Sequence, residues 1–212
     1  MEILPLAQTS PGRSGNSKSA KRREAFLEEA GDLFLRNGFD NVTIDAIIAR
    51  SGGSKASIYR EFGSKEALFS EAIRQRCERT LRPIMQPAST SEDPAVTLSS
   101  FGVTFLKCVL SDDGILIHRI VLAEARRFPE VGHVFYSAGP RSVYRALWTI
   151  FLHLEEQSRT PAGSAERLAR LFHGMILTEL QLGRLLADAP MPDDACLHGH
   201  VEAAVRALLR EA

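Results

Sequence analysis

The chain has 212 residues, of which 44% are hydrophobic and 25% charged, and its formal net charge at pH 7 is zero. This balance is typical of a globular protein that buries a core in one or two domains. It excludes a highly charged disordered chain, and no apolar run reaches the length of about 18 residues that a membrane span needs.

The cysteines point to a reducing compartment. Cys77, Cys108 and Cys196 are scattered along the chain and odd in number, so we expect no disulfide framework. The first residues contain no apolar stretch behind a basic flank, so we expect no signal peptide. The sequence therefore predicts a cytoplasmic protein that does not associate with a membrane.

The N-terminal third begins with an irregular segment and continues with helical patterns. Residues 1–17 are rich in Ser, Pro and Gly, and we interpret them as a disordered arm. From near Ser19, apolar residues recur at helical spacing as far as Asn37, where Asn37-Gly38 is a typical helix end. Three capping residues then predict three further helices, namely Thr43 for 44–50, Ser54 for 55–61 and Ser64 for a helix to Arg82 that Pro83 stops.

After a linker at 86–93, every segment shows helical periodicity and none alternates like a strand. The expected helices are 94–110, 113–128, 130–157 with a kink or break at Gly139-Pro140, 165–187 capped by Ser164, and a last helix to Arg210 capped by Asp193 or Asp194. The fold prediction is all-α, with roughly nine or ten helices. We place a DNA-binding domain with its linking helix at 18–82 and a helical body at 83–212.

The two short helices near residues 43–62 have the pattern of a helix-turn-helix. Ile44, Ile47 and Ile48 give the first helix an apolar face, and Gly52 lies in the turn. Ile58 and Phe62 are four residues apart, so both can anchor the second helix against a core. The rest of the second helix is then free to enter a major groove.

The outward side chains suit double-stranded DNA. Lys55 and Arg60 can neutralise phosphate or donate to guanine, and the small Ala56 and Ser57 allow close approach. The Tyr59 hydroxyl can bind phosphate. Helix N-termini favour phosphate as well, and the complete set of predicted DNA-binding residues is Thr43, Ser54, Lys55, Ala56, Ser57, Tyr59, Arg60 and Lys65. The charge distribution agrees, since residues 1–82 hold 14 basic and 11 acidic side chains against 12 and 15 in residues 83–212.

The run TIDAIIARSGGSKASIYREFGSKEALF, with the helix and the GFDNVT before it, resembles the DNA-binding domain of the TetR/AcrR family over about residues 20–80. The resemblance implies that three helices bind DNA and that a fourth links them to a helical body that binds a ligand and dimerises. By position, it implies phosphate contacts at Thr43, Tyr59, Arg60 and Lys65, and base-edge neighbours at Lys55, Ala56, Ser57 and Tyr59. The stretch VLAEARRFPEVGHVFYSAGP at 121–140 is similar to the AefR-like subgroup of the same family.

Two residues depart from the family's pattern. Gly53 stands where the family usually has an apolar residue, often Val, and we expect it to loosen the turn and reduce packing. Glu61 replaces a commoner His, Tyr or Asn, and its carboxylate near DNA phosphate needs a partner such as Lys65 or a cytosine amino group.

The body shows no catalytic motif, and we expect it to contain a ligand pocket. All six histidines follow residue 117 without metal-site spacing, and no phosphate loop or nucleophile motif is present, so we expect no metal, no cofactor and no enzyme activity. A small, mainly apolar effector would contact aromatic and apolar side chains. The candidates are Phe101, Phe105, His118, Leu122, Tyr144, Trp148, Phe151, Phe172 and Met175.

Apolar residues cover most of the circumference of 165–187 and one stripe of the last helix, so we predict a homodimer through these two helices. The main functional hypothesis is a ligand-responsive repressor that binds a palindromic operator as a dimer. Two alternatives stay open: a helical small-molecule-binding or enzymatic protein with a purely structural helix-turn-helix, and a DNA-binding activator without an effector.

Overall fold

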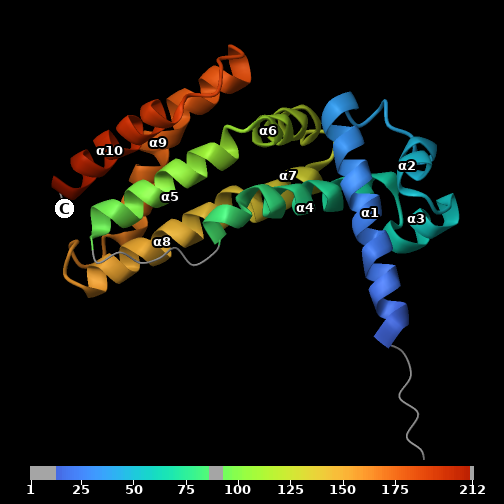
Figure 1. The fold of residues 1–212 in the computed structure, drawn as a ribbon, viewed down its shortest axis with the longest axis horizontal. Helices are drawn as coiled ribbons and strands as arrows, with labels where there is room; N and C mark the ends of the chain where they lie inside the picture. The colour runs from blue at the N-terminus through green and yellow to red at the C-terminus, as the bar shows by residue number, and fades with distance from the viewer. Residues whose placement is uncertain (1–12, 86–92, 211–212) are drawn as a thin grey trace, which may run out of the picture.

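The computed structural model describes residues 13–85 and 93–210, and within these ranges every regular element is an α-helix (Figure 1). The all-α prediction is therefore confirmed. The helices are α1 (Arg13–Asn37), α2 (Ile44–Ser51), α3 (Lys55–Phe62), α4 (Lys65–Met85), α5 (Pro94–Val109), α6 (Asp112–Glu124), α7 (Pro129–Ala138), α8 (Pro140–Glu156), α9 (Ala165–Leu186) and α10 (Asp194–Arg210).

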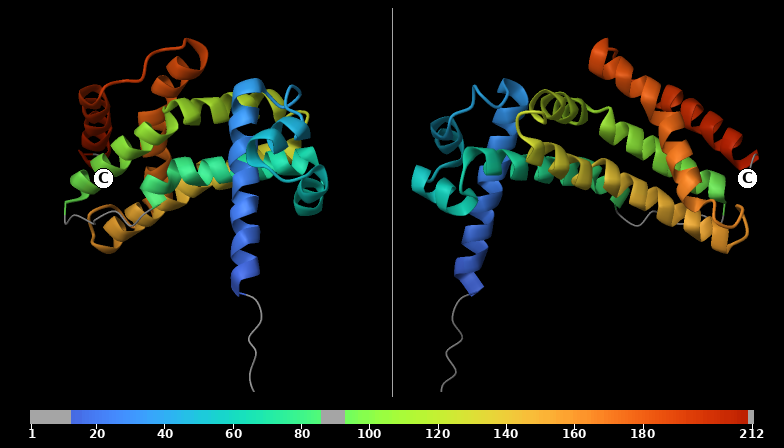
Figure 2. Two further views of the ribbon diagram at one scale, coloured as in Figure 1. Left: turned by 45° about the vertical axis from the view of Figure 1, so that its right-hand side comes forward. Right: turned by 180° about the vertical axis from the view of Figure 1, so that it is seen from behind.

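The molecule is elongated, with α1, α2 and α3 at one end and the C-terminus at the other (Figures 1 and 2). Helix α4 leaves the N-terminal end and runs into the body beside α7 and α5. Helices α8 and α9 pack against each other, and α10 lies on α5 and α9. Helix α4 thus connects the N-terminal helices with the body.

Two hydrophobic cores lie along this length, and the first of them takes residues from both sides of position 82. The N-terminal core contains Phe26, Phe34 and Ile58, and it also takes Ile120 from α6 and Val131 from α7. The second core is built by α5, α8, α9 and α10. Helix α4 enters both cores, through its first turns and its last turns respectively. The N-terminal end is therefore packed directly onto the body.

Short-range chemistry sets most helix bounds. Prolines occupy the first turn of α5, α7 and α8, where no backbone hydrogen bond is lost. Asp193 is the cap of α10, because its Oδ1 accepts from the Cys196 amide at 2.8 Å. At Gly139-Pro140 the expected kink is a full break that separates α7 from α8.

Several predicted bounds need correction. Helix α1 begins at Arg13, so residues 13–17, expected in the disordered arm, are helical, since extending a formed helix adds one hydrogen bond per residue. Helix α4 passes through Pro83, which removes only one hydrogen bond in the last turn, and α6 ends at Glu124, before the extended residue that precedes Pro129. The predictions for residues 1–12 and 86–92 lie outside the described residues.

Ser164 does not cap α9 as the sequence predicts, because its hydroxyl donates to the Pro161 carbonyl at 2.6 Å. The Glu155 carboxylate takes that place, accepting from the amides of Gly163 and Ala165.

Within the described ranges, no single helix has the length and hydropathy of a membrane span. Helices α5 and α6 reach this length and hydropathy only as a pair that is bent by 62°.

Candidate DNA-binding surface and ligand cavity

Three hydroxyl side chains fix where α2, α3 and α4 begin. Thr43 Oγ1 accepts from the Ala46 amide at 3.1 Å, and Ser54 Oγ accepts from the Ser57 amide at 3.2 Å. Ser64 Oγ does the same for α4, accepting from the Ala67 amide at 3.1 Å. All three caps predicted from the sequence are confirmed, and each satisfies an amide that the helix leaves without a partner.

The underside of this unit is buried. Ile47 and Ile58 are fully inaccessible, and Ile44 is buried as well. Phe62 is half-buried, with its ring edge-to-face against Phe26 at a centroid distance of 6.5 Å. These contacts hold α3 against α1, as the four-residue spacing of Ile58 and Phe62 predicts.

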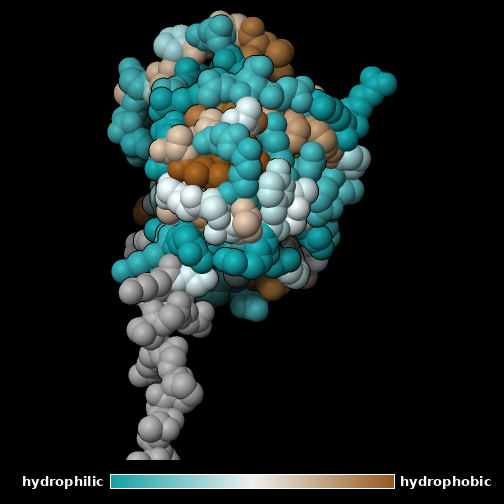
Figure 3. All heavy atoms as spheres, turned by 90° about the vertical axis from the view of Figure 1, so that its right-hand side faces the viewer, coloured by the Kyte–Doolittle hydropathy of each residue, from teal (hydrophilic) through white to brown (hydrophobic). Residues whose placement is uncertain are grey.

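The opposite face of α3 is open to solvent. Lys55, Ala56 and Arg60 are exposed, Tyr59 is 47% exposed, and Ser57 is half-buried. Figure 3 looks onto the end of the molecule that carries α1–α3, and its surface is mainly hydrophilic. Five of the predicted DNA-binding residues thus share one short helix on an accessible face, with the exposed caps Thr43 and Ser54 beside it.

The charged groups of this face differ in how they are held. Lys55 Nζ lies 2.8 Å from Asp45 Oδ2, and this hydrogen bond raises the pKa of the lysine. No ion pair joins Arg60 to another described residue, so its guanidinium is available to an anion. Lys65 Nζ, in the first turn of α4, lies over the Phe39 ring at 4.2 Å from its centre.

The two departures from the family's pattern have structural explanations. Glu61 pairs with Arg23 Nε of α1 at 3.2 Å, where the sequence suggested Lys65. Gly53 does not loosen the turn: its φ is +94°, and a Cβ there would lie 2.8 Å from Phe26 Cζ. The Phe26 ring thus fills the space that a side chain at 53 would occupy, so the expectation of reduced packing is wrong.

A buried arginine joins the DNA-binding end to the body. The Arg76 side chain on α4 is only 4% exposed and pairs with Asp32 of α1 and, at 3.0 Å, with Asp113 of α6. Arg79 repeats the connection from a more exposed position, contacting Glu28 of α1 and Asp113 at 3.3 Å. This cluster was not predicted, although an arginine among the apolar neighbours Ala72, Ile73 and Cys77 was a signal.

The body contains a cavity of about 300 Å³ lined by residues of α4, α5, α6, α7, α8 and α9. Its wall combines aliphatic and aromatic side chains and includes no Lys, Arg, Asp or Glu side chain among the described residues. The polar groups of the wall are contributed by Cys77, Thr80, His118, Tyr136, Tyr144, His173 and Gln181. This composition is typical of a site for a small organic molecule.

Three of the predicted ligand residues, Phe105, His118 and Tyr144, line this cavity. The others do not, because their helices turn them elsewhere. Phe101, Phe151 and Phe172 are in the second core, Leu122 is 72% exposed on α6, and Trp148 and Met175 are exposed on α8 and α9. Helical spacing identified the apolar positions but not which neighbour each one faces.

His173, Gln181 and Phe135 also line the cavity, and they are not among the predicted ligand residues. A signal existed for two of them: His173, Leu177 and Gln181 are four residues apart and form one stripe of α9. Two polar side chains along an otherwise apolar helix face indicate a polar feature in its neighbour, here the cavity.

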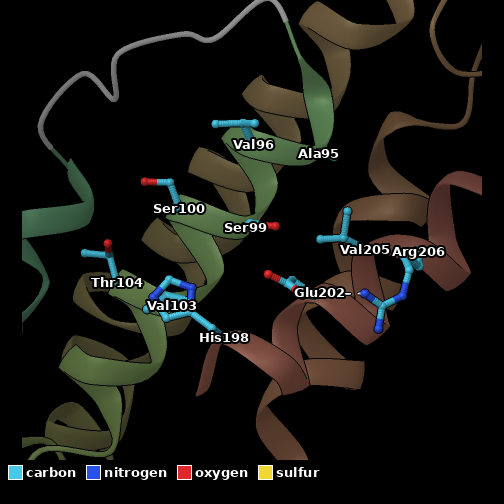
Figure 4. Close-up of a pocket in the computed structure, with 10 residues that line it drawn as sticks. All are labelled: Ala95, Val96, Ser99, Ser100, Val103, Thr104, His198, Glu202, Val205 and Arg206. Atoms are coloured by element: carbon cyan, nitrogen blue, oxygen red, sulfur yellow. Dashed lines mark ion pairs between the residues drawn. The ribbon is translucent and has the colours of Figure 1, made fainter. Parts of the chain in front are cut away.

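A larger hollow of about 650 Å³ lies between α5 and α10 (Figure 4). It is an open groove, and the side chains along it include His198 and the ion pair of Glu202 with Arg206 at 3.5 Å. It is more open to solvent than the smaller cavity, which makes it a poorer ligand site.

Other chemistry is limited. No group of three His, Cys, Asp or Glu side chains within the described residues is arranged to hold a metal ion. Cys77 and Cys108 are buried, Cys196 is exposed, and all three are free thiols. Burial raises the pKa of Cys77 to about 12, so this cavity residue is an uncharged thiol.

Curated relatives match part of this chain. HTH-type transcriptional regulator YdeS of Bacillus subtilis (strain 168) is 27% identical over 109 residues, 51% of this chain and 52% of that protein. LmrA of the same organism, also an HTH-type transcriptional regulator, is 34% identical over 80 residues, 37% of this chain and 43% of that one. The matched segments span about half the length of these curated relatives.

Solved structures match over nearly the whole chain. A TetR-family transcriptional regulator from Mesorhizobium loti MAFF303099 superposes with a TM-score of 0.84 at 21% identity, covering 92% of this chain and 98% of that one. The flavonoid-responsive regulator FrrA superposes with a TM-score of 0.78 at 26% identity, covering 91% and 97%.

Two family descriptions cover most of the sequence. Residues 26–72 match bacterial regulatory proteins of the tetR family, and residues 96–211 match the C-terminal domain of the AefR-like transcriptional repressors. The first match contains α2, α3 and their caps, and the second contains most of the cavity wall. The chain therefore belongs to the TetR family, with a C-terminal domain of the AefR-like subgroup.

Proposed function

We propose that the protein is a transcriptional repressor that binds a palindromic operator as a homodimer and releases it when a small effector enters the cavity. The exposed face of α3 carries this proposal, because it presents Lys55, Tyr59 and Arg60 on a helix anchored by the buried Ile58. The names of the AefR-like repressors and of FrrA support repression and response to a ligand.

DNA binding is tested by selecting operators from a random double-stranded library and footprinting the selected sequence. Tyr59→Ala and Lys65→Ala should each weaken operator binding about tenfold or more, since both residues are expected at phosphates. Lys107→Ala, which removes an exposed lysine from α5, is the matched control and should change it less than twofold. Unchanged specific binding in both DNA-face variants would contradict the docking.

For the dimer, the exposed apolar residues favour α9 with α8 over α9 with α10. Trp148 and Leu152 on α8 and Leu171 and Met175 on α9 are exposed. The outer face of α10 instead has small residues such as Ala207. We propose that the α8–α9 face pairs with its copy and sets the spacing of the two α3 helices.

The dimer is tested by sedimentation. Trp148→Glu should give monomers, whereas Ala207→Glu on α10 should leave the dimer intact. If the α10 variant alone dissociates, the pairing predicted from the sequence, α9 with α10, replaces this one.

Release follows from a shift between two states of the dimer. Cys77, Thr80 and Leu81 bring the cavity wall onto α4, the helix that also carries Arg76 and continues from the DNA-binding end. A ligand that fits the cavity better in one position of α4 favours the spacing of that state. Such a regulator performs no turnover and acts in the cytoplasm, where the chromosome is.

A further inference from the structure

The chemistry of the cavity wall restricts the effector, and this inference rests on the effector site proposed above. His118 is held by two hydrogen bonds: its Nδ1 is 2.8 Å from the Gly114 carbonyl and its Nε2 is 2.9 Å from Gln181 Nε2. A carbonyl only accepts, so Nδ1 carries the hydrogen and Nε2 accepts from the Gln181 amide group. Burial lowers the pKa of His118, which keeps the ring neutral in this arrangement.

This arrangement leaves an acceptor on a side chain that lines the cavity. The Gln181 amide nitrogen uses one of its two hydrogens on His118, and its carbonyl oxygen forms no hydrogen bond with another described residue, so this oxygen can accept from a further group. A ligand that donates one hydrogen bond would satisfy it.

His173 is the second unsatisfied polar group. Its ring lies between Tyr144, at a centroid distance of 4.4 Å, and Phe105, at 5.3 Å. Neither ring nitrogen forms a hydrogen bond within the described residues, although burial lowers the pKa of His173 to about 4. A neutral imidazole offers one donor and one acceptor, and the half-buried ring of His173 can give both to a ligand.

We propose that the effector is an uncharged, flat aromatic molecule of one or two rings that carries a hydroxyl group, which hydrogen-bonds to His173 or Gln181. The cavity volume of about 300 Å³ is suited to a molecule of this size. The rings of Phe105, Phe135 and Tyr144 provide stacking surfaces. A carboxylate would lose its hydration without a cationic side chain in the wall to compensate.

The test uses 2-naphthol and 2-naphthoate at pH 7.5, with binding to the full chain measured by calorimetry in the absence of DNA. The neutral phenol should bind at least 100-fold more tightly than the carboxylate of the same ring system. Equal or stronger binding of 2-naphthoate overturns the proposal, and so does the absence of 2-naphthol binding up to its solubility limit.

Variants then locate the site. His173→Phe keeps a ring between Tyr144 and Phe105 but cannot hydrogen-bond, so it should weaken 2-naphthol about tenfold while changing naphthalene less than twofold. His133→Phe, an exposed histidine of α7 outside the cavity wall, is the control and should bind like the wild type. Equal loss in both variants, or none in either, would place the binding elsewhere.

The two proposals fail separately. Ligand binding is measured without DNA, and operator binding without ligand. Loss of operator binding alone refutes the repressor, whereas a preference for 2-naphthoate refutes only the ligand class.

Discussion

A methyl group added at Gly53 tests the packing of the helix-turn-helix against α1. Gly53 has a φ of +94°, and a Cβ there would come within 2.8 Å of Phe26 Cζ and 3.1 Å of Cε1. The positive φ costs an alanine about 1–2 kcal/mol. Phe26 is almost completely buried and cannot move away freely, so the overlap adds about 1–3 kcal/mol.

Gly63→Ala is the matched control for this change. Gly63 has a similar φ of +83°, but a Cβ there would meet no atom within 4 Å. It therefore has the conformational cost without the overlap. In urea unfolding we expect Gly53→Ala to lower the free energy of unfolding by about 1–3 kcal/mol more than Gly63→Ala does.

A double-mutant cycle identifies the overlapping partner. In a Phe26→Leu background the ring atoms that meet the new Cβ are absent, so the extra cost of Gly53→Ala should largely disappear. If Gly53→Ala and Gly63→Ala are equally destabilising, the turn relaxes around the side chain. In that case the Phe26 ring does not fill the space that a side chain at position 53 would occupy.

Three further predictions concern charge. Arg76→Met should lower the free energy of unfolding by about 2–4 kcal/mol, because it leaves carboxylates without their buried partner. Arg79→Met removes a more exposed arginine and should lower it by at most about 1 kcal/mol. Equal losses of the two variants in urea unfolding would contradict the buried role of Arg76. The pKa of His173 is about 4 in the folded protein and 6.5 ordinarily, so the unfolded chain binds a proton at higher pH than the folded protein does. The free energy of unfolding should therefore fall by up to about 3 kcal/mol as the pH drops from 6.5 to 4. His173→Phe should lack this loss while keeping the loss that is due to His118. If the pH–stability curves of this variant and the wild type are parallel, His173 does not contribute to the pH dependence. Asp45→Asn should tighten operator binding two- to fivefold by releasing Lys55, and fluorescence anisotropy showing weaker binding would exclude competition between Asp45 and phosphate.

The parts of the fold that depend on neighbours in sequence could be predicted. Thr43, Ser54 and Ser64 cap their helices through amides three residues ahead, so their roles follow from local geometry. Ser164 has the same residue type but a different outcome. The start of α9 is capped by the Glu155 carboxylate of α8, which accepts from the amides of Gly163 and Ala165. The packing of α8 on α9 brings Glu155 close to these amides.

The cavity and the arginine cluster depend on contacts between distant segments. The sequence identified Tyr144 as aromatic and His173 as a histidine, but only the packing of α8 on α9 brings their rings to 4.4 Å. The partners of Arg76 come from α1 and α6, 44 residues before it and 37 after it. Periodicity along one helix contains no information about such partners.

The core that α6 and α7 share with the N-terminal helices limits how this protein can exchange parts with its relatives. A chimera that joins residues 13–85 to another body would have to supply counterparts of Ile117, Ile120, Val121 and Val131, or leave apolar surface exposed at the junction. New operator specificity is therefore easier to acquire by substitutions on the outer face of α3 than by replacing the whole N-terminal segment of residues 13–85.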